Sequence, residues 1–490
     1  MTTQTRTERR TNAGGFPLAA ALALACWGLV AELAFAAEKL NVVFLMADDL
    51  GWNGPRFQGS DLHETPSLDR LAAEGMKFTD AYAACTVCSP TRAAVLTGQY
   101  PARLHLTDWI AGQRRPFAKL KIPDWTKQLE HSRVTLAEAL QAKGYSTAHV
   151  GKWHLGAQPF YPEHQGFDVN VAGNSSGSPP GGYFLPNKLN LPGAKQGDYL
   201  TDRLTDEALE IIERWKDRPF FLYFPYYTVH TPIQGKKELV KRYASKVKPD
   251  SKHRNPTYAA MVHSLDESVG RITAKLKELG IARRTVIFFT SDNGGLSQRN
   301  GKLTGITDNF PLRRGKGSAY EGGVRVPLVV RWPGVIQPGT VCREPVCSID
   351  YYPTVLQLTG VSGDPKHNRD VDGRSLAPIL KDPKSKLDRD AIYWHYPHYH
   401  AGGDSPYGAV RAGDWKLIEF YEDMSVELYN LRDDLGEADN LVARMPDKAD
   451  ELRKQLHAWR SSVDAQMPTP NPNYDPQKAS SQAKKKPNKK

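Results

Sequence analysis

Two nearly continuous apolar segments, each followed directly by acidic residues, constrain the fold more than any other feature of this chain. Residues 40–47 (LNVVFLMA) precede Asp48 and Asp49, and residues 285–290 (TVIFFT) precede a Ser-Asp-Asn-Gly-Gly sequence at 291–295. Unbroken apolar runs are typical of strands buried on both faces of a parallel sheet. One acidic pair alone could be a turn or a helix cap. Carboxylates after two buried strands are costly unless neutralised, so the pattern predicts an α/β fold with a divalent metal site.

Two further strand-like segments are followed by basic residues. Residues 146–150 lead into a Gly-Lys-Trp-His sequence that contains Lys152 and His154, and residues 220–224 lead towards His230. Either histidine alone could be structural. Open α/β folds bind their ligands at the carboxyl edge of the sheet, however, and these side chains would meet at that edge.

A lysine between two glycines adds another basic element. Lys316 lies in an Arg-Arg-Gly-Lys-Gly sequence at 313–317, before the strand-like residues 324–331. Glycines on both sides let the backbone come close to an anion. A solvated basic loop is the alternative interpretation.

The segment around Cys88 combines a cysteine and an arginine with a predicted helix start. Cys-Ser-Pro-Thr-Arg at 88–92 runs into Ala-Ala-Val-Leu-Thr-Gly, which is typical of a short helix ended by glycine. A helix that starts near Pro90 would place Cys88 at its positive end and Arg92 one turn further in, where both favour an oxyanion. The alternative is a buried cysteine beside a surface arginine. Together with a metal, two lysines and two histidines, the segment suits a doubly charged tetrahedral oxyanion ester.

The segment at 88–98 resembles the signature of the type I, formylglycine-dependent sulfatases of the alkaline phosphatase superfamily. The resemblance covers roughly residues 38–465, and the other family motifs occur in the family's order at Asp48-Asp49, 151–154, His230, 291–294 and 315–317. It implies an alkaline-phosphatase-like α/β fold over residues 37–387, with a large mixed, mostly parallel sheet sandwiched by helices. A smaller C-terminal α+β domain, residues 388–466, would follow, with an antiparallel sheet and a helix.

The resemblance also implies a cofactor and a metal. A separate maturation enzyme would oxidise Cys88 to Cα-formylglycine, whose hydrate attacks sulfur with one hydroxyl and expels sulfate through the second. One Ca²⁺, with Mg²⁺ as the alternative, would be held by oxygen ligands. These would come from Asp48, Asp49, Asp292 and Asn293, together with residue 88.

The resemblance further implies roles for the basic residues. Arg92 would hold the formylglycine, and His154 would be the base that lets the geminal hydroxyls collapse. Lys152, His230 and Lys316 would hold sulfate. Either His230 or Lys316 would give a proton to the leaving oxygen, and the sequence does not decide between them.

The N-terminal residues predict export. Three arginines at positions 6, 9 and 10 precede an apolar stretch at 16–30, and Ala-Phe-Ala at 34–36 fits a cleavage site. Residues 1–36 therefore predict a secretory signal peptide that is cleaved after Ala36. No other segment is long and apolar enough to cross a bilayer. We expect a secreted or periplasmic protein with no membrane contact after cleavage.

The cysteines and the net charge argue against two other classes of protein. Cys85, Cys88, Cys342 and Cys347 remain after cleavage, too few for a disulfide scaffold, although the last two are close enough to pair. The signal region contributes +1 and six lysines after residue 477 contribute +6 to the formal net charge of +11, which leaves +4. Without a nucleic-acid motif, this modest excess predicts no nucleic-acid binding and suits an anionic substrate.

The C-terminal part of the chain changes pattern after residue 388. Short antiparallel strands are predicted at 392–395, 409–411, 415–421 and 426–431. Pro446 opens a predicted helix whose Leu452, Leu456 and Trp459 share one face. Residues 467–490, rich in Pro, Asn, Ser and Lys, predict a disordered basic tail.

Three histidines are candidates for contact with the substrate. His105 follows the predicted nucleophile helix, and His395 and His398 lie in a His- and Tyr-rich stretch at 395–400. Ordinary packing on a sheet is the alternative for that stretch. Both regions resemble those of bacterial sulfatases that act on sulfated polysaccharides, including N-acetylgalactosamine and galactose sulfates. We therefore expect an exo-acting carbohydrate sulfatase, with aryl sulfates as smaller substrates.

Three other functions are compatible with parts of this pattern. A phosphonate monoester or phosphodiester hydrolase of the same superfamily could share the fold and the formylglycine. A zinc phosphatase would use Ser or Thr as its nucleophile and would need Asp and His ligands for a second metal, which we cannot assemble from this sequence. A secreted carbohydrate-binding protein could keep the fold without the activity.

Overall fold

The computed structural model describes residues 1–5 and 39–479, except for residues 187, 190, 192 and 404. Leu40–Lys490 group as one compact unit, and Met1–Lys39 group as another. The predicted signal peptide therefore lies almost wholly outside the described residues. Within the described part of the chain, no helix is long and apolar enough to span a membrane.

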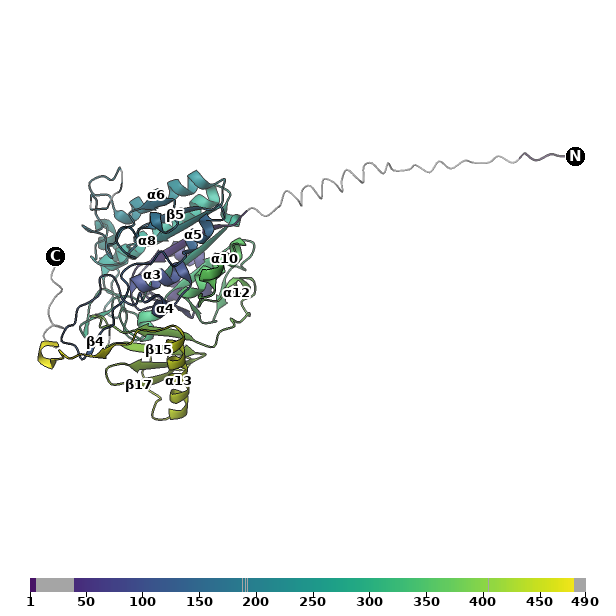
Figure 1. Ribbon diagram of the computed structural model, residues 1–490. Coiled ribbons are helices and arrows are strands. Elements are labelled where there is room, and N and C mark those ends of the chain that lie inside the picture. Colours follow the sequence, from purple (N-terminus) through teal and green to yellow (C-terminus); the bar gives the residue numbers. More distant parts are fainter. Residues whose placement is uncertain (6–38, 187, 190, 192, 404, 480–490) are drawn as a thin grey trace. The chain divides into compact units, whose positions relative to one another are not determined.

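An eight-stranded sheet in the order β12-β2-β11-β8-β1-β7-β5-β6 is the centre of the larger unit (Figure 1). Only β11 runs antiparallel to its neighbours, β2 and β8, and the other pairings are parallel. This confirms the predicted large, mostly parallel sheet. Its strands are β1 (Asn41–Ala47), β2 (Met76–Phe78), β5 (Ser146–Val150), β6 (Val169–Val171), β7 (Phe220–Pro225), β8 (Thr285–Ser291), β11 (Leu328–Arg331) and β12 (Thr340–Cys342).

The four apolar segments that predicted strands are β1, β5, β7 and β8, which lie side by side in the order β8-β1-β7-β5. Every residue of β1, β7 and β8 is buried, as their unbroken apolar sequences require. The strand predicted at 324–331 begins later, at Leu328, because Glu321–Val324 form the short helix α9. The carboxyl ends of four adjacent strands thus meet at one edge of the sheet.

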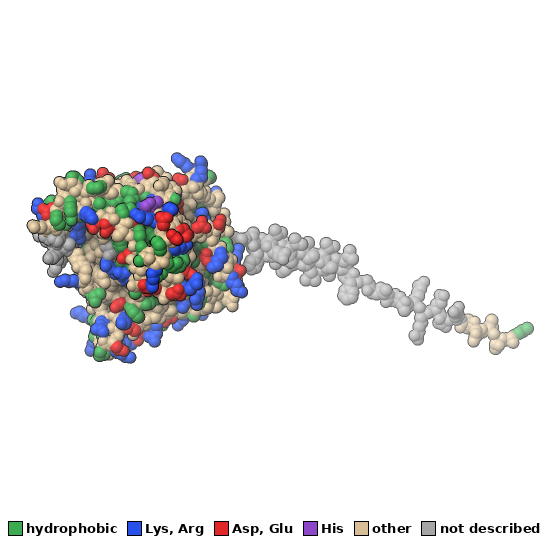
Figure 2. Space-filling view, turned by 90° about the horizontal axis from the view of Figure 1, so that it is seen from below, with side chains coloured by type: hydrophobic (Ala, Val, Ile, Leu, Met, Phe, Trp, Pro, Cys, Tyr) green, Lys and Arg blue, Asp and Glu red, His purple; other side chains and the backbone are tan. Residues whose placement is uncertain are grey.

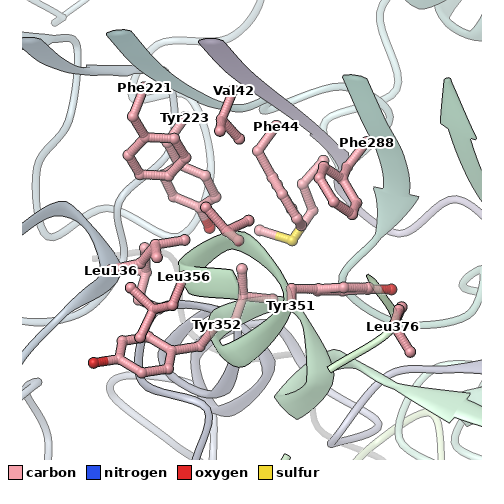
Figure 3. Packing of buried hydrophobic residues seen from close by; sticks show 14 of the residues in the cluster. Val42, Phe44, Leu136, Phe221, Tyr223, Phe288, Tyr351, Tyr352, Leu356 and Leu376 are labelled. Carbon is pink, nitrogen blue, oxygen red and sulfur yellow. The ribbon is translucent and has the colours of Figure 1, made fainter. Parts of the chain in front are cut away.

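Helices cover both faces of this sheet. Alternate residues of β1 point to opposite sides, so Val42, Phe44 and Met46 pack in one core cluster while Val43, Leu45 and Ala47 pack in another. Figure 3 shows Phe44 and Phe288 facing Tyr351 of α10 in the first cluster. The first face is covered by α3 (Cys88–Thr97), α5 (Leu136–Gln141), α10 (Tyr351–Thr359) and α12 (Ala377–Lys381), and the second by α2 (Pro66–Glu74), α6 (Leu200–Trp215) and α8 (Pro256–Glu278).

A four-stranded antiparallel sheet, β14-β15-β16-β17, follows near the C-terminus (Figure 1). Its strands are β14 (Ile392–Tyr396), β15 (Tyr407–Ala412), β16 (Trp415–Phe420) and β17 (Val426–Asn430), and α13 (Pro446–Ser462) packs on it. Leu452, Leu456 and Trp459 of α13 share a core cluster with this sheet, as predicted. Tyr82 belongs to the same cluster, so the small sheet packs against the part of the chain that carries the large one.

The remaining elements are short connections. They are the strands β3 (Ala81–Tyr82), β4 (Leu120–Lys121), β9 (Gln298–Arg299), β10 (Lys302–Leu303), β13 (Val346–Cys347) and β18 (Thr469–Pro470), the helices α4 (Pro101–Leu104), α7 (Lys237–Ala244) and α11 (Pro365–Asn368), and the 3₁₀ turns η1 (Arg56–Gln58), η2 (Pro162–His164), η3 (Ala282–Arg284) and η4 (Ser348–Asp350).

One prediction about the C-terminal part is wrong, and one question that the sequence left open is answered. Disorder from Met467 onwards is wrong for residues 467–479, because β18 pairs with β4 and the Asn471 side chain donates hydrogen bonds to the carbonyls of Pro116 and Ala118. Residues 480–490 lie outside the described part. Cys342 and Cys347 do not pair: both are free and buried, on strands of two different sheets.

The surface charge is mixed on the face that Figure 2 shows. Lys and Arg side chains are interspersed there with Asp and Glu. Nucleic-acid binding proteins usually concentrate their basic side chains in a patch or stripe. This face does not have that distribution.

Candidate active site

The predicted site residues gather where the four central strands end. Asp48 and Asp49 follow β1, Asp292 follows the last residue of β8, and Lys152 and His154 follow β5. His230 lies beyond β7, near Asp49: its Nε2 is 3.7 Å from Asp49 Oδ2. Strand order alone therefore brings together residues that are up to 244 positions apart.

Cys88 is the first residue of α3, and the helix that follows it is buried throughout. Gly98 ends the helix in the left-handed conformation, with φ of 70°, as the sequence predicts. Arg92 is fully buried, which removes the surface-arginine alternative. Its Nε and Nη2 donate to Asp292 Oδ2 at 3.0 and 2.7 Å, and its Nη1 donates to the Lys152 carbonyl at 2.9 Å. Arg92 thus fixes α3 to the ends of β8 and β5.

The acidic and basic groups of the site form buried ion pairs. Lys152 Nζ lies 2.7 Å from Asp48 Oδ2, and Lys316 Nζ lies 2.6 Å from Asp49 Oδ1. Burial and the neighbouring Asp292 raise the pKa of Asp48 well above its ordinary value. Burial also acts to raise the pKa of Asp49, but Lys316 and His230 outweigh it and hold that pKa below its ordinary value.

His154 faces Cys88 with one ring nitrogen and the backbone with the other. Nδ1 lies 3.4 Å from Cys88 Sγ, and Nε2 is hydrogen-bonded to the Ile110 carbonyl. A carbonyl oxygen can only accept, so Nε2 carries the hydrogen and Nδ1 presents a lone pair. Burial, helped by Lys152, lowers the pKa of His154 well below its ordinary value and favours this neutral form.

His230 is oriented in the opposite sense. Its Nδ1 is 2.8 Å from the Thr231 carbonyl and therefore carries the hydrogen, so that Nε2 faces Asp49. Burial, together with the charge of Lys316, lowers the pKa of His230 to about 3. Both predicted histidines are thus neutral rings with one nitrogen fixed by a backbone carbonyl.

The acidic residues fit a hard divalent cation. Asp48 Oδ1 and Asn293 Oδ1 are buried and have no hydrogen-bond partner among the described residues. Asn293 is held in this orientation because its Nδ2 donates to Asp49 Oδ1 at 2.7 Å. Ligand atoms of Asp48, Asp49 and His230 lie within 4.8 Å of one another. Buried carboxylate and amide oxygens without other partners are the donors that Ca²⁺ and Mg²⁺ prefer.

The three histidines predicted to contact substrate lie elsewhere. The ring of His395 is buried between the Tyr421 hydroxyl and the Gln466 carbonyl, and His398 is buried with its Nε2 2.8 Å from Thr107 Oγ1. His105 Nε2 contacts the Asp464 carbonyl at 2.9 Å, beside a cavity of about 150 Å³ that none of the catalytic candidates lines. The structure therefore does not support substrate contact for His395 and His398, because their rings bind other parts of the chain.

His400 lies at the site instead. A Cβ at Gly317 would fall 1.9 Å from its Nδ1, so its ring lies directly against the residue after Lys316. Burial and the charge of Lys316 lower the pKa of His400 to about 3. His400 belongs to the His- and Tyr-rich stretch at 395–400, but it is not among the three histidines predicted to contact the substrate. The residue pattern of this stretch does not show which ring points towards the site. His400 lies beyond the end of β14, where the alternation of a strand no longer fixes the direction of a side chain.

Comparison with known proteins identifies the family. A profile of the sulfatase family matches residues 40–361, and a second profile, N-sulphoglucosamine sulphohydrolase, C-terminal, matches residues 315–464. The chain belongs to the sulfatase family. It is therefore an enzyme that hydrolyses sulfuric esters of carbohydrates or related substrates.

Curated relatives agree over most of the chain. A sulfatase of Formosa agariphila is 34% identical over 86% of this chain and 89% of its own length. Mouse N-acetylgalactosamine-6-sulfatase is 36% identical over 76% of this chain and 72% of its own length, and human arylsulfatase A is 32% identical over 89% and 90%.

Solved structures confirm the fold. The structure of Ps i-CgsB in complex with k-i-k-neocarrahexaose has a TM-score of 0.71 and 28% identity, and covers 89% of this chain and 95% of its own. A phosphonate monoester hydrolase of Agrobacterium radiobacter has a TM-score of 0.61 at 19% identity over 87% of this chain and 96% of its own, which shows the shared fold alone.

Proposed function

We propose that this enzyme is an exo-acting carbohydrate sulfatase that uses a formylglycine made from Cys88 and one bound Ca²⁺. The observation that carries the proposal is the position of Cys88. It begins a buried helix, lies 3.4 Å from the lone-pair nitrogen of His154, and is followed one turn later by a fully buried arginine. A structural cysteine needs none of these neighbours.

The residues divide the chemistry between them. Asp48, Asp49, Asp292 and Asn293 would hold the cation with residue 88, and the cation would polarise the sulfate oxygens. The hydrated formylglycine would supply the attacking hydroxyl and a second hydroxyl for release of sulfate. Arg92 orients residue 88, and His154 Nδ1 accepts the proton that this residue gives up. Lys152, His230 and Lys316 bind the sulfate oxygens, and Lys316 or His230 protonates the leaving oxygen.

The substrate class comes from the relatives. One is named for N-acetylgalactosamine 6-sulfate, and one structural neighbour at 28% identity is complexed with a neocarrahexaose. We propose a sulfated sugar of the N-acetylgalactosamine or galactose type as substrate. A separate maturation enzyme would oxidise Cys88, and export to the periplasm or the medium would follow from the predicted signal peptide. A phosphonate monoester or phosphodiester hydrolase is the alternative, since the same fold occurs in such an enzyme.

Mass spectrometry of the tryptic peptide 78–92, from protein purified from its own host, tests the nucleophile. Conversion of Cys88 lowers the peptide mass by the difference between the H₂S lost and the oxygen gained. Cys85 lies in the same peptide and serves as an internal control, because alkylation should then label one cysteine and not two. Two alkylated cysteines in native, exported protein would overturn the proposed mechanism.

Matched esters test the reaction. We expect turnover of a sulfated monosaccharide and of an aryl sulfate, with much slower turnover of the corresponding aryl phosphonate. A preference for the phosphonate would favour the alternative activity. Turnover of a terminal sulfate but not of an internal one in an oligosaccharide would support exo action.

A further inference from the structure

The segment 108–113 lies beside the nucleophile and contains a buried carboxylate that the proposed mechanism does not use. Asp108 is fully buried, and its Oδ1 accepts hydrogen bonds from the Trp109 amide at 2.9 Å and from the Tyr396 hydroxyl at 2.6 Å. Burying a carboxylate is costly, and these hydrogen bonds offset only part of that cost, because burial still raises the pKa of Asp108 to about 7. The two bonds hold the start of this segment in place.

The same segment contacts the nucleophile helix and the base. The Ile110 amide donates to Ser89 Oγ at 3.2 Å, and Ser89 Oγ donates to the His154 carbonyl at 2.9 Å. The Ile110 carbonyl accepts from His154 Nε2. The Ile110 backbone therefore contacts the residue after Cys88 with its amide and the ring of His154 with its carbonyl, and Ser89 in turn contacts the main chain of His154.

The position of the Ile110 carbonyl decides what His154 can do. With the hydrogen held at Nε2, the lone pair of Nδ1 points towards residue 88 and can accept a proton. If the carbonyl moved away, the ring could rotate or take the other tautomer, with a hydrogen on Nδ1 and no acceptor at residue 88. In general, the hydrogen-bond partner of one ring nitrogen sets the tautomer of a functional histidine and so the role of the other nitrogen.

We propose that Asp108 and Tyr396 are positioning residues for the base: they hold segment 108–113 so that the Ile110 carbonyl keeps the Nδ1 lone pair of His154 on residue 88. Tyr396 is the last residue of β14, in the C-terminal sheet, and is almost fully buried. Through the Tyr396 hydroxyl, the C-terminal sheet thereby helps to position His154. This inference rests on the proposed function, in which His154 is the base.

Four variants of the full-length, matured enzyme test the proposal by steady-state kinetics with 4-nitrophenyl sulfate. We expect Tyr396→Phe and Asp108→Ala to lower kcat by about ten-fold or more, while KM changes by less than about three-fold. Asp108→Asn, whose amide oxygen can still accept both bonds, should recover most of kcat. Tyr421→Phe is the matched control, because it removes a buried hydroxyl of the same region that contacts His395 and not segment 108–113.

A second measurement follows the ring itself. In ¹⁵N-histidine-labelled protein, with His154→Gln to assign the signal, wild-type His154 should show the Nε2–H tautomer. Tyr396→Phe and Asp108→Ala should show a mixture with the Nδ1–H form, and Tyr421→Phe should not. The formylglycine content of every variant is measured on peptide 78–92, so that a failure of maturation is not mistaken for a failure of positioning.

The outcomes separate the two proposals. If wild-type enzyme does not hydrolyse the sulfate ester, the proposed function fails. If wild-type enzyme is active and Tyr396→Phe keeps both its kcat and the Nε2–H signal, the positioning role is overturned. Equal losses of kcat in Tyr396→Phe and Tyr421→Phe, with an unchanged tautomer, would also overturn it, because that pattern reports only lost stability.

Discussion

At the scale of single residues, the charges within the site balance one another. Asp48, Asp49 and Asp292 face Arg92, Lys152 and Lys316, each in a buried ion pair. A divalent cation bound by the carboxylates would release the two lysines, whose ammonium groups could then bind sulfate. The same side chains can thus stabilise the site both without a cation and with one bound.

This balance predicts how the enzyme responds to chelation. Removal of the cation with EDTA should abolish activity, because the sulfate oxygens lose their polarising partner. The protein should stay folded, since the lysines neutralise the carboxylates. Its free energy of unfolding should fall only by the linkage term, about 2.7 kcal/mol at a cation concentration one hundred times Kd. Activity and thermal unfolding, measured before chelation and after adding Ca²⁺ or Mg²⁺, check this. Full activity after exhaustive chelation would contradict it.

The dependence of kcat on the leaving group can show which residue gives a proton to the leaving oxygen. Neutral His230 has its hydrogen on Nδ1, bound to the Thr231 carbonyl, so its Nε2 has none to give, whereas the ammonium of Lys316 does. We expect Lys316→Ala to lose about 100-fold more kcat with an alkyl sulfate than with an acidic aryl sulfate. His230→Ala should lose the same factor with both esters. The reverse pattern would assign His230 as the donor.

At the scale of elements, the loop that carries Lys316 depends on a glycine. Gly317 has φ of 88°, and a Cβ there would lie 1.9 Å from His400 Nδ1. The loop 398–403 packs closely on it: a Cβ at Gly402 would lie 2.4 Å from the Lys316 carbonyl. There is therefore no space for a side chain at position 317.

Gly317→Ala should consequently displace Lys316. We expect kcat/KM to fall by about 100-fold, the effect of misplacing a reacting group by about 1 Å. Gly301→Ala is the control, because Gly301 also has positive φ, 72°, but nothing lies within 4 Å of its added Cβ. Both substitutions carry the same kind of backbone cost. Equal activity of the two variants would contradict the role given to the loop.

At the scale of the whole molecule, buried charges join the C-terminal sheet to the catalytic part. Lys416 of β16 is fully buried, with its Nζ 2.8 Å from Glu321 Oε1 and 2.9 Å from Glu437 Oε1. Glu321 also accepts from the Tyr82 hydroxyl at 2.7 Å. Glu321 begins α9, a few residues after Lys316, so this cluster also anchors the loop of the active site.

Removing Lys416 should therefore destabilise the enzyme strongly. Lys416→Met leaves Glu437 buried without its cation and leaves Glu321 paired with Arg325 alone, and we expect the free energy of unfolding to fall by about 3–5 kcal/mol. Lys454→Met is the control, because Lys454 pairs with Asp450 on the surface with its side chain 77% exposed, and water screens such a pair so that it contributes little to stability. Urea unfolding of both variants measures the difference. Equal midpoints would show that the buried cluster does not stabilise the fold.

Much of the site could be predicted because it follows strand ends. Apolar runs such as β1 and β8 are local signals of burial, and the polar residues directly after them must lie at the edge of the sheet. Similarly, Cys88 and Arg92 lie in a short helix whose start and end are indicated by Pro90 and Gly98. The order of neighbouring strands was not visible in the sequence, but adjacency of the four strands was enough to bring their ends together.

The parts that could not be predicted depend on contacts between distant segments. The sequence shows which ring types lie in the stretch 395–400 but not which way they point, and only the loop after β14 turns His400 onto Gly317. Residues 467–479 are ordered because β18 pairs with β4, which lies some 350 residues earlier in the chain. Composition alone could not reveal a strand whose partner is so remote.

The sequence by itself thus determined the class of fold and which acidic and basic residues, with Cys88, gather where the strands end, because each is marked by a local pattern of burial or by a short motif. The tertiary structure decided which histidine nitrogen faces Cys88 and how the C-terminal sheet takes part. The Ile110 carbonyl that fixes His154 is a backbone atom, which every residue has, so only its placement in space gives it a role.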